Sequence, residues 1–158
     1  MRYLASLLIA TSLSAFAFNA QALTAEQTVE KETTVVGADG SVQTIRESIE
    51  KIVPGERIVY SLNYANDKTD AAKDIVLTMP IPSEVKFIEG TANAPMANVT
   101  YSADGGETFS NRQSVMLMDS TGNVRAAAAD ELTHVRWTVP GPIEAGNGGV
   151  LSFSATVR

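Results

Sequence analysis

Cysteine is absent from the 158-residue chain, histidine occurs once, at His134, and aromatic residues make up only 6%. Without cysteine there is no disulfide, thiol nucleophile or thiolate metal site. Zinc sites and hydrolytic triads need several well-placed partners, which a single histidine rarely finds. Paired carboxylates remain possible, but the acidic residues are scattered in turns and in residues 23–50. We therefore predict no enzyme, no catalytic residue, no metal site and no cofactor.

Long hydrophobic runs are also absent, except at the start of the chain. Arg2 and the free amine precede an apolar run over residues 4–18, and Ala20-Gln21-Ala22 fits the small-x-small cleavage rule. The run is shorter than the roughly 20 residues that span a bilayer. An uncleaved amphipathic anchor is the alternative. The pattern predicts a signal peptide over residues 1–22 and a periplasmic or secreted protein.

Cleavage after Ala22 leaves 136 residues, a length typical of one domain with an adequate core. It removes one of twelve basic residues and none of the eighteen acidic ones, which leaves a net charge of −7. Such a charge repels nucleic acid and anionic lipid. No later apolar run is long enough to cross a membrane. The predicted partner is an unknown cell-envelope protein or polysaccharide.

Residues 53–66 show the pattern that the rest of the chain repeats. A Pro-Gly turn is followed by a stretch in which large apolar residues alternate with smaller ones, namely Ile58, Tyr60, Leu62 and Tyr64. A period of two places this set on one face of a strand, toward a core.

Further short strands are predicted between turn signals, over residues 74–79, 85–88, 99–102, 115–118, 134–139 and 150–158. Residues 119–130 are expected to form a loop with one helical turn. The sequence thus predicts an all-β fold, an immunoglobulin-like antiparallel β-sandwich of about 7–9 strands over residues 51–158. A closed barrel is the alternative.

Residues 23–50 are rich in threonine, valine and glutamate, with a turn signal at residues 37–40. We predict an amino-terminal hairpin or edge strands, whose charges suit an exposed edge. Ile45, Ile49 and Ile52 also lie at helical spacing, so a helix over residues 41–51 is the alternative.

Several of these motifs together resemble the domain of unknown function 11 family, over roughly residues 52–158. The motifs are residues 54–62 followed by Asn66, the Tyr-Ser-x-Asp-Gly turn within residues 99–106, Trp137, and the closing strand after Gly146. The resemblance implies an immunoglobulin-like module of bacterial exported and surface proteins. Two features depart from the family: Thr78-Met79-Pro80 lacks its usual aspartate, and the chain has no internal repeat. The motifs describe turns and core, so they say little about function.

Two residues of the predicted strand 134–139 have side chains that are candidates for catalysis or binding. His134 falls on the polar face beside Arg136, and we interpret it as an exposed side chain. Trp137 is able to stack on a sugar, but it is in line with Val135 and Val139, so we predict a core position.

Four methionines suggest a soft-metal site, since thioethers favour Cu(I); they are Met79, Met96, Met116 and Met118. Met79 takes an inward position in an alternating strand, and Met116 and Met118 share one face of another. Core filling is therefore the favoured interpretation.

Two further motifs are similar to a calcium site and to a glycosylation site. Residues 63–70 contain two asparagines and two aspartates, but without calcium-loop spacing, so a plain turn is favoured over a calcium site. Asn98-Val99-Thr100 matches a glycosylation acceptor and has little weight in a bacterial-looking chain.

The function predicted from these features is a non-enzymatic, exported β-sandwich module with a structural or adhesion role at the cell envelope. Strand addition along the amino-terminal edge would supply the contact. The alternatives are a carbohydrate-binding module that uses Tyr101 and Phe109, and a periplasmic metal-handling protein that uses His134 and the methionines.

The leader assignment predicts that the protein recovered from the periplasm or medium begins at Leu23, which amino-terminal sequencing measures. An Ala22→Asp variant should retain the leader, because signal peptidase requires a small residue there. Full-length chain in the cytosol of wild-type cells, still starting at Met1, would contradict the assignment.

Overall fold

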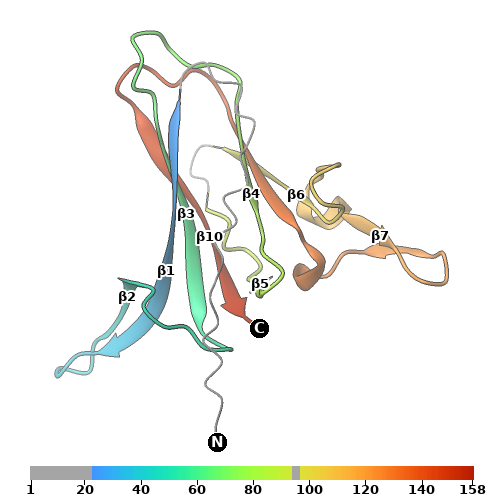
Figure 1. Cartoon of the computed structure of the whole chain (residues 1–158), viewed down its shortest axis with the longest axis horizontal. Coiled ribbons are helices and arrows are strands. Elements are labelled where there is room, and N and C mark those ends of the chain that lie inside the picture. Colours follow the sequence, from blue (N-terminus) through green and yellow to red (C-terminus); the bar gives the residue numbers. More distant parts are fainter. Residues whose placement is uncertain (1–22, 94–96) are drawn as a thin grey trace, which may run out of the picture.

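The computed structural model describes residues 23–93 and 97–158, and it shows an all-β fold (Figure 1). The first sheet has the order β2-β1-β3-β10-β5, and the second has the order β4-β9-β6. Every strand pairing within both sheets is antiparallel. The first sheet consists of β1 (Thr24–Val36), β2 (Val42–Ser48), β3 (Arg57–Ala65), β5 (Val85–Phe87) and β10 (Gly148–Val157). The second consists of β4 (Ile75–Pro80), β6 (Asn98–Ser102) and β9 (His134–Val139).

The two sheets enclose one core, as the alternating patterns predicted. Trp137 of β9 and Phe153 of β10 are both fully buried. Phe153 stacks on Tyr60 with ring centroids 5.0 Å apart, and it lies 5.8 Å from the Phe87 ring. Aromatic side chains from three strands of the first sheet thus pack in one core with Trp137 of the second sheet, which confirms the predicted sandwich.

The outer face of the first sheet is also partly closed. Ser152 and Ser154 alternate with the core residues of β10 and so lie on this face, but both are buried. The side chain of Arg57 crosses the face, where its Nη2 donates to Ser154 Oγ at 3.2 Å and its Nε pairs with Glu32 at 2.8 Å. A long side chain laid over short ones therefore accounts for the burial of Ser154.

β1 and β2 form the predicted hairpin, and the alternative of a helix over residues 41–51 is wrong. The turn closes with Gly37 N donating to Ser41 O, and Gly40 has a φ of 81°. β1 pairs with β3 through residues 24–31 and with β2 through residues 30–36. Its last five residues therefore leave the sandwich with β2 as a two-stranded ribbon, visible at the lower left of Figure 1.

Residues 51–158 contain eight strands in the described part of the chain, β3 to β10, which agrees with the 7–9 predicted there, and β1 and β2 bring the described total to ten. The structure departs from the prediction in residues 119–130, where we expected a loop with one helical turn. β7 (Met116–Met118) and β8 (Val124–Ala126) form a separate small hairpin there, which projects at the right of Figure 1. The helical turn is present as a short 3₁₀ turn, Ala129–Glu131.

The core packing predicts that Phe153→Ala lowers the free energy of unfolding by about 3–5 kcal/mol, because it leaves a cavity between the two sheets. Urea denaturation measures this change. Val150→Ala is the matched control in the same strand, since Val150 is half exposed, and it should cost less than about 1 kcal/mol. Equal losses for the two variants would contradict the described core.

Candidate functional site

The outer face of the second sheet gathers the polar residues that the sequence placed opposite the core. β9 is its central strand, so Arg136 lies between Thr78 of β4 and Thr100 of β6. Thr138 is opposite Val76 on one side and Asn98 on the other. We call these residues, together with Phe109, the β9 face.

Arg136 is held at the centre of the β9 face by two contacts. Its guanidinium carbon lies 3.4 Å from the centre of the Phe109 ring, a cation–π arrangement. Its Nε donates to Thr78 Oγ1 at 3.2 Å. From the sequence, Phe109 was recognisable only as a loop aromatic, and its contact with Arg136 was not predicted.

His134 lies next to this pair and is half buried, not exposed as predicted. Its ring meets the Phe109 ring edge-on at 6.4 Å, and its Nδ1 is 3.1 Å from Thr133 Oγ1. Burial, followed by the positive charge of Arg136, lowers the pKa of His134, and Asp104 opposes the shift. The imidazole is therefore neutral at pH 7 and adds no second positive charge to the β9 face.

A tight turn over residues 102–108 supports one end of the β9 face. The Asp104 carboxylate accepts hydrogen bonds from Ser102 Oγ at 2.6 Å, from Thr108 Oγ1 at 2.5 Å and from the backbone N–H groups of Glu107 and Thr108. These bonds, above all that of Ser102, hold the pKa of Asp104 well below its ordinary value. Because its oxygens accept hydrogen bonds from the turn, we assign Asp104 a structural role and not a catalytic one.

Tyr101 and Trp137, the other aromatic candidates, face inward. Trp137 is fully buried, which confirms the predicted core position. Tyr101 is only 9% exposed, and its ring packs against Phe87 at 5.7 Å. Of the two aromatics proposed for a carbohydrate site, only Phe109 reaches the surface.

The structure confirms the core position predicted for Met79 and contradicts the one predicted for Met116 and Met118. Met79 is 1% exposed and fills the core, as predicted. The inward placement of Met116 and Met118 is wrong, because they are 52% and 72% exposed. β7 pairs only with β8 among the described strands, and Leu117 between them is the residue that packs on the core. Met96 lies outside the described residues.

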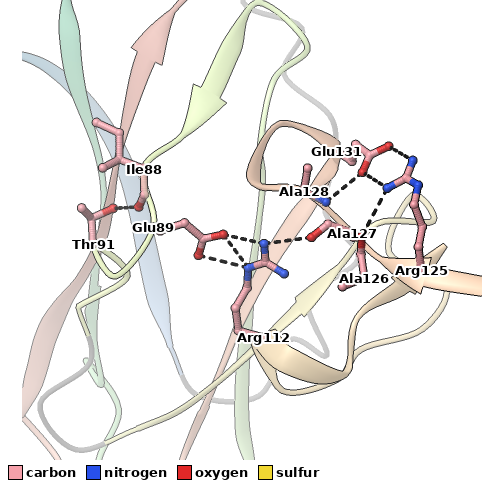
Figure 2. Close-up of polar contacts among 9 residues, drawn as sticks. All are labelled: Ile88, Glu89, Thr91, Arg112, Arg125, Ala126, Ala127, Ala128 and Glu131. Atoms are coloured by element: carbon pink, nitrogen blue, oxygen red, sulfur yellow. Dashed lines mark hydrogen bonds and ion pairs between the residues drawn. The ribbon is translucent and has the colours of Figure 1, made fainter.

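Two arginines fix the base of the β7–β8 hairpin, as Figure 2 shows. Arg112 Nε donates to Glu89 Oε1 at 2.8 Å, and its Nη2 donates to Ala127 O at 2.9 Å. Arg125 makes two 2.6 Å bonds to Glu131, which lower the pKa of Glu131 to about 2. Both guanidinium groups are thus paired with a carboxylate, whereas Arg136 forms no ion pair with a described residue.

The Asn/Asp-rich stretch over residues 63–70 forms a turn built on Asn66. Asn66 is fully buried; its Nδ2 donates to Asp70 O and Ile143 O, both at 2.8 Å, and its Oδ1 accepts from Lys68 N. Over residues 23–93 and 97–158 there is no group of three or more His, Asp or Glu side chains placed to hold a metal ion. Asn98, the glycosylation motif's asparagine, is exposed at the start of β6.

Comparisons of the chain with protein-family models, curated proteins and solved structures found no significant match. The resemblance to the domain of unknown function 11 family therefore stays a prediction. Within the described part of the chain, no helix has the length and apolar character needed to cross a membrane.

The Asp104 turn predicts a pH-dependent contribution to stability. Because the folded chain lowers this pKa, the contribution is fully present above the ordinary value of 3.8 and is lost as the pH falls below it. Asp104→Asn should lower the melting temperature at pH 7, and the gap to wild type should narrow steadily below pH 3.8. Thermal unfolding at several pH values measures this gap, and a gap independent of pH would contradict the role of the charge.

Proposed function

We propose that this chain is an exported, non-enzymatic β-sandwich module that holds a cell-envelope protein by strand addition along the β1–β2 edge. The leader pattern and the family resemblance support an extracytoplasmic location. The structural observation that supports the proposal is the long edge formed by β1 and β2, of which one end extends beyond the sandwich.

This edge has two parts. Over residues 24–29, β1 pairs with β3 on one side and with no described strand on the other. Beyond this stretch β2 becomes the outermost strand. Edge strands present backbone N–H and C=O groups that pair with an extended segment of another chain.

The free ribbon, residues 32–36 with residues 42–46, continues the edge by about 17 Å. Three valines near its tip are exposed, namely Val35, Val36 and Val42, at 42%, 66% and 67%. Apolar side chains at such positions can enter pockets on a partner strand or sheet, which gives strand addition its specificity.

The ribbon is anchored where it leaves the sandwich. Lys31 forms an ion pair with Glu56, and Glu32 pairs with Arg57. Glu56 Oε2 also accepts from Val53 N at 2.9 Å, which joins the anchor to the turn before β3. The base of the ribbon is thereby fixed, so a bound partner would be held at a defined orientation.

The other edges suit strand addition less well. β5 spans only three residues, and β4 spans six and ends at Pro80, which has no N–H to donate. The segment after β5 runs along β10, where Ile88 N and Asn93 N donate to Ser154 O and Ser152 O. β6 spans five residues, and its Tyr101 exchanges both backbone hydrogen bonds with Ser110. The β1–β2 edge is therefore the best candidate among the described strands of the two sheets.

The test shortens the ribbon without removing β1, because loss of β1 would uncover β3 across eight paired residues. Residues 35–43 are replaced by Asn-Gly, a two-residue hairpin turn that joins the paired residues Thr34 and Thr44. A photo-reactive side chain placed at Arg46 should crosslink an envelope protein in the parent chain. We expect the crosslink to be lost or greatly reduced in the shortened chain.

A matched probe at Thr138, on the β9 face, serves as the control and should give no crosslink to the same protein. The shortened chain should keep the melting temperature to within a few degrees, since the ribbon contributes little to the core. An unchanged crosslink from Arg46 in the shortened chain would place the interface elsewhere, as would the same crosslink from Thr138.

A further inference from the structure

Among the described residues, Arg136 has no carboxylate partner, whereas Arg57, Arg112 and Arg125 are each paired with a glutamate. Arg46 and Arg158 also form no described ion pair with an acidic side chain, but both are exposed and Arg136 is half buried. The formal net charge of the chain is −6, and this half-buried guanidinium lies at the centre of the second sheet. It leaves two terminal nitrogens to donate to an anion.

The guanidinium is also pre-organised. The Phe109 ring supports one of its faces, and Thr78 accepts from Nε, so the planar fork is fixed in orientation. Fixing a rotamer-rich side chain before binding removes most of the entropy cost of ordering it in the complex. A fixed fork matches the two oxygens of a carboxylate better than a mobile lysine would.

The neighbours of Arg136 across the sheet are hydroxyl groups, those of Thr100 and Thr78, and the Asp104 carboxylate lies in the turn at one end of the β9 face. Two residues further along, exposed Thr138 of β9 lies between exposed Asn98 of β6 and half-exposed Val76 of β4. His134 is kept neutral by burial. The β9 face thus presents one cation beside neutral hydrogen-bonding groups, and the Asp104 carboxylate at its end is bonded within its own turn.

We propose that the β9 face binds an acidic saccharide, whose carboxylate pairs with Arg136 and whose ring hydroxyls bond to Thr100, Thr138 and Asn98. The site is independent of the β1–β2 edge, because it lies on the outer face of the other sheet.

The position of the site in the sheet favours a saccharide over an acidic peptide. β9 is paired on both sides, with β4 and with β6, so its backbone N–H and C=O groups are used within the sheet. An extended peptide finds no main-chain ladder there and would depend on one charge alone. A sugar acid bears hydroxyls around its carboxylate, which match the threonine and asparagine side chains.

A sugar on the β9 face would bind differently from the carbohydrate site on Tyr101 and Phe109 that the sequence suggested. One face of the Phe109 ring is covered by the guanidinium, and Tyr101 is buried, so these two rings do not form a stacking platform. Phe109 acts here as a positioning residue for Arg136. Because the acidic chain repels polyanions at long range, a short saccharide is the appropriate probe.

The experiment titrates the mature chain with a galacturonate trisaccharide and follows backbone amide shifts by NMR. Shifts should concentrate on β4, β6 and β9, and the methyl-esterified trisaccharide, which keeps the hydroxyls but has no charge, should bind at least tenfold more weakly. Arg136→Gln should weaken binding roughly ten- to a hundredfold, the range for a charge-assisted hydrogen-bonded pair. Arg125→Gln is the matched control and should bind as wild type.

Arg136→Lys serves if the glutamine variant does not fold: it keeps the charge but not the fork, and it too should weaken binding. Phe109→Leu should reduce affinity while leaving the folded spectrum intact. Equal binding of the ester, undiminished binding by the folded Arg136 variant, or no shifts at all would overturn the proposal. A glutamate tripeptide that binds as tightly as the trisaccharide would also overturn it, because the β9 face would then recognise a carboxylate and not a sugar.

Discussion

The alternation of side chains along β9 is the constraint on which both surfaces of the second sheet depend. Val135 and Trp137 are fully buried, so the residues between them must point to the opposite face. The apolar positions therefore fix the placement of Arg136 as firmly as any contact that Arg136 makes. A shift in register of one residue would bury the guanidinium and expose the indole. Packing of the core therefore determines which side chains lie on the surface.

Local patterns were sufficient to predict most of the fold. Period-two alternation identified β3, β9 and β10, and turn chemistry identified the amino-terminal hairpin around residues 37–40. The prediction from alternation was wrong at Met116 and Met118. The same alternation is present there, but the strand is not part of the sandwich. Alternation reports which residues share a face and not what that face meets, so a projecting hairpin and a core strand look alike.

The β9 face was predicted only in part for a related reason. The outward positions of His134 and Arg136 follow from the strand pattern, but their contact with Phe109 depends on how the loop after β6 folds back. That return is set by the Asp104 turn and by the pairing of Tyr101 with Ser110. Gly106, with a φ of 91°, lies against the His134 ring at a point where a Cβ atom would come within 3.4 Å of it. A contact that requires a turn, a loop and a strand together leaves no periodic signal in the sequence.

The division of β1 between two partners has a mechanical consequence. Load applied to the tip of the ribbon would pull β1 along its own axis, past β3. Antiparallel ladder bonds lie perpendicular to the strands, so such a pull strains the whole eight-residue ladder at once instead of opening it pair by pair from one end. A tether attached in this way resists sliding with all of its bonds together, whereas a force across the sheet would unzip it.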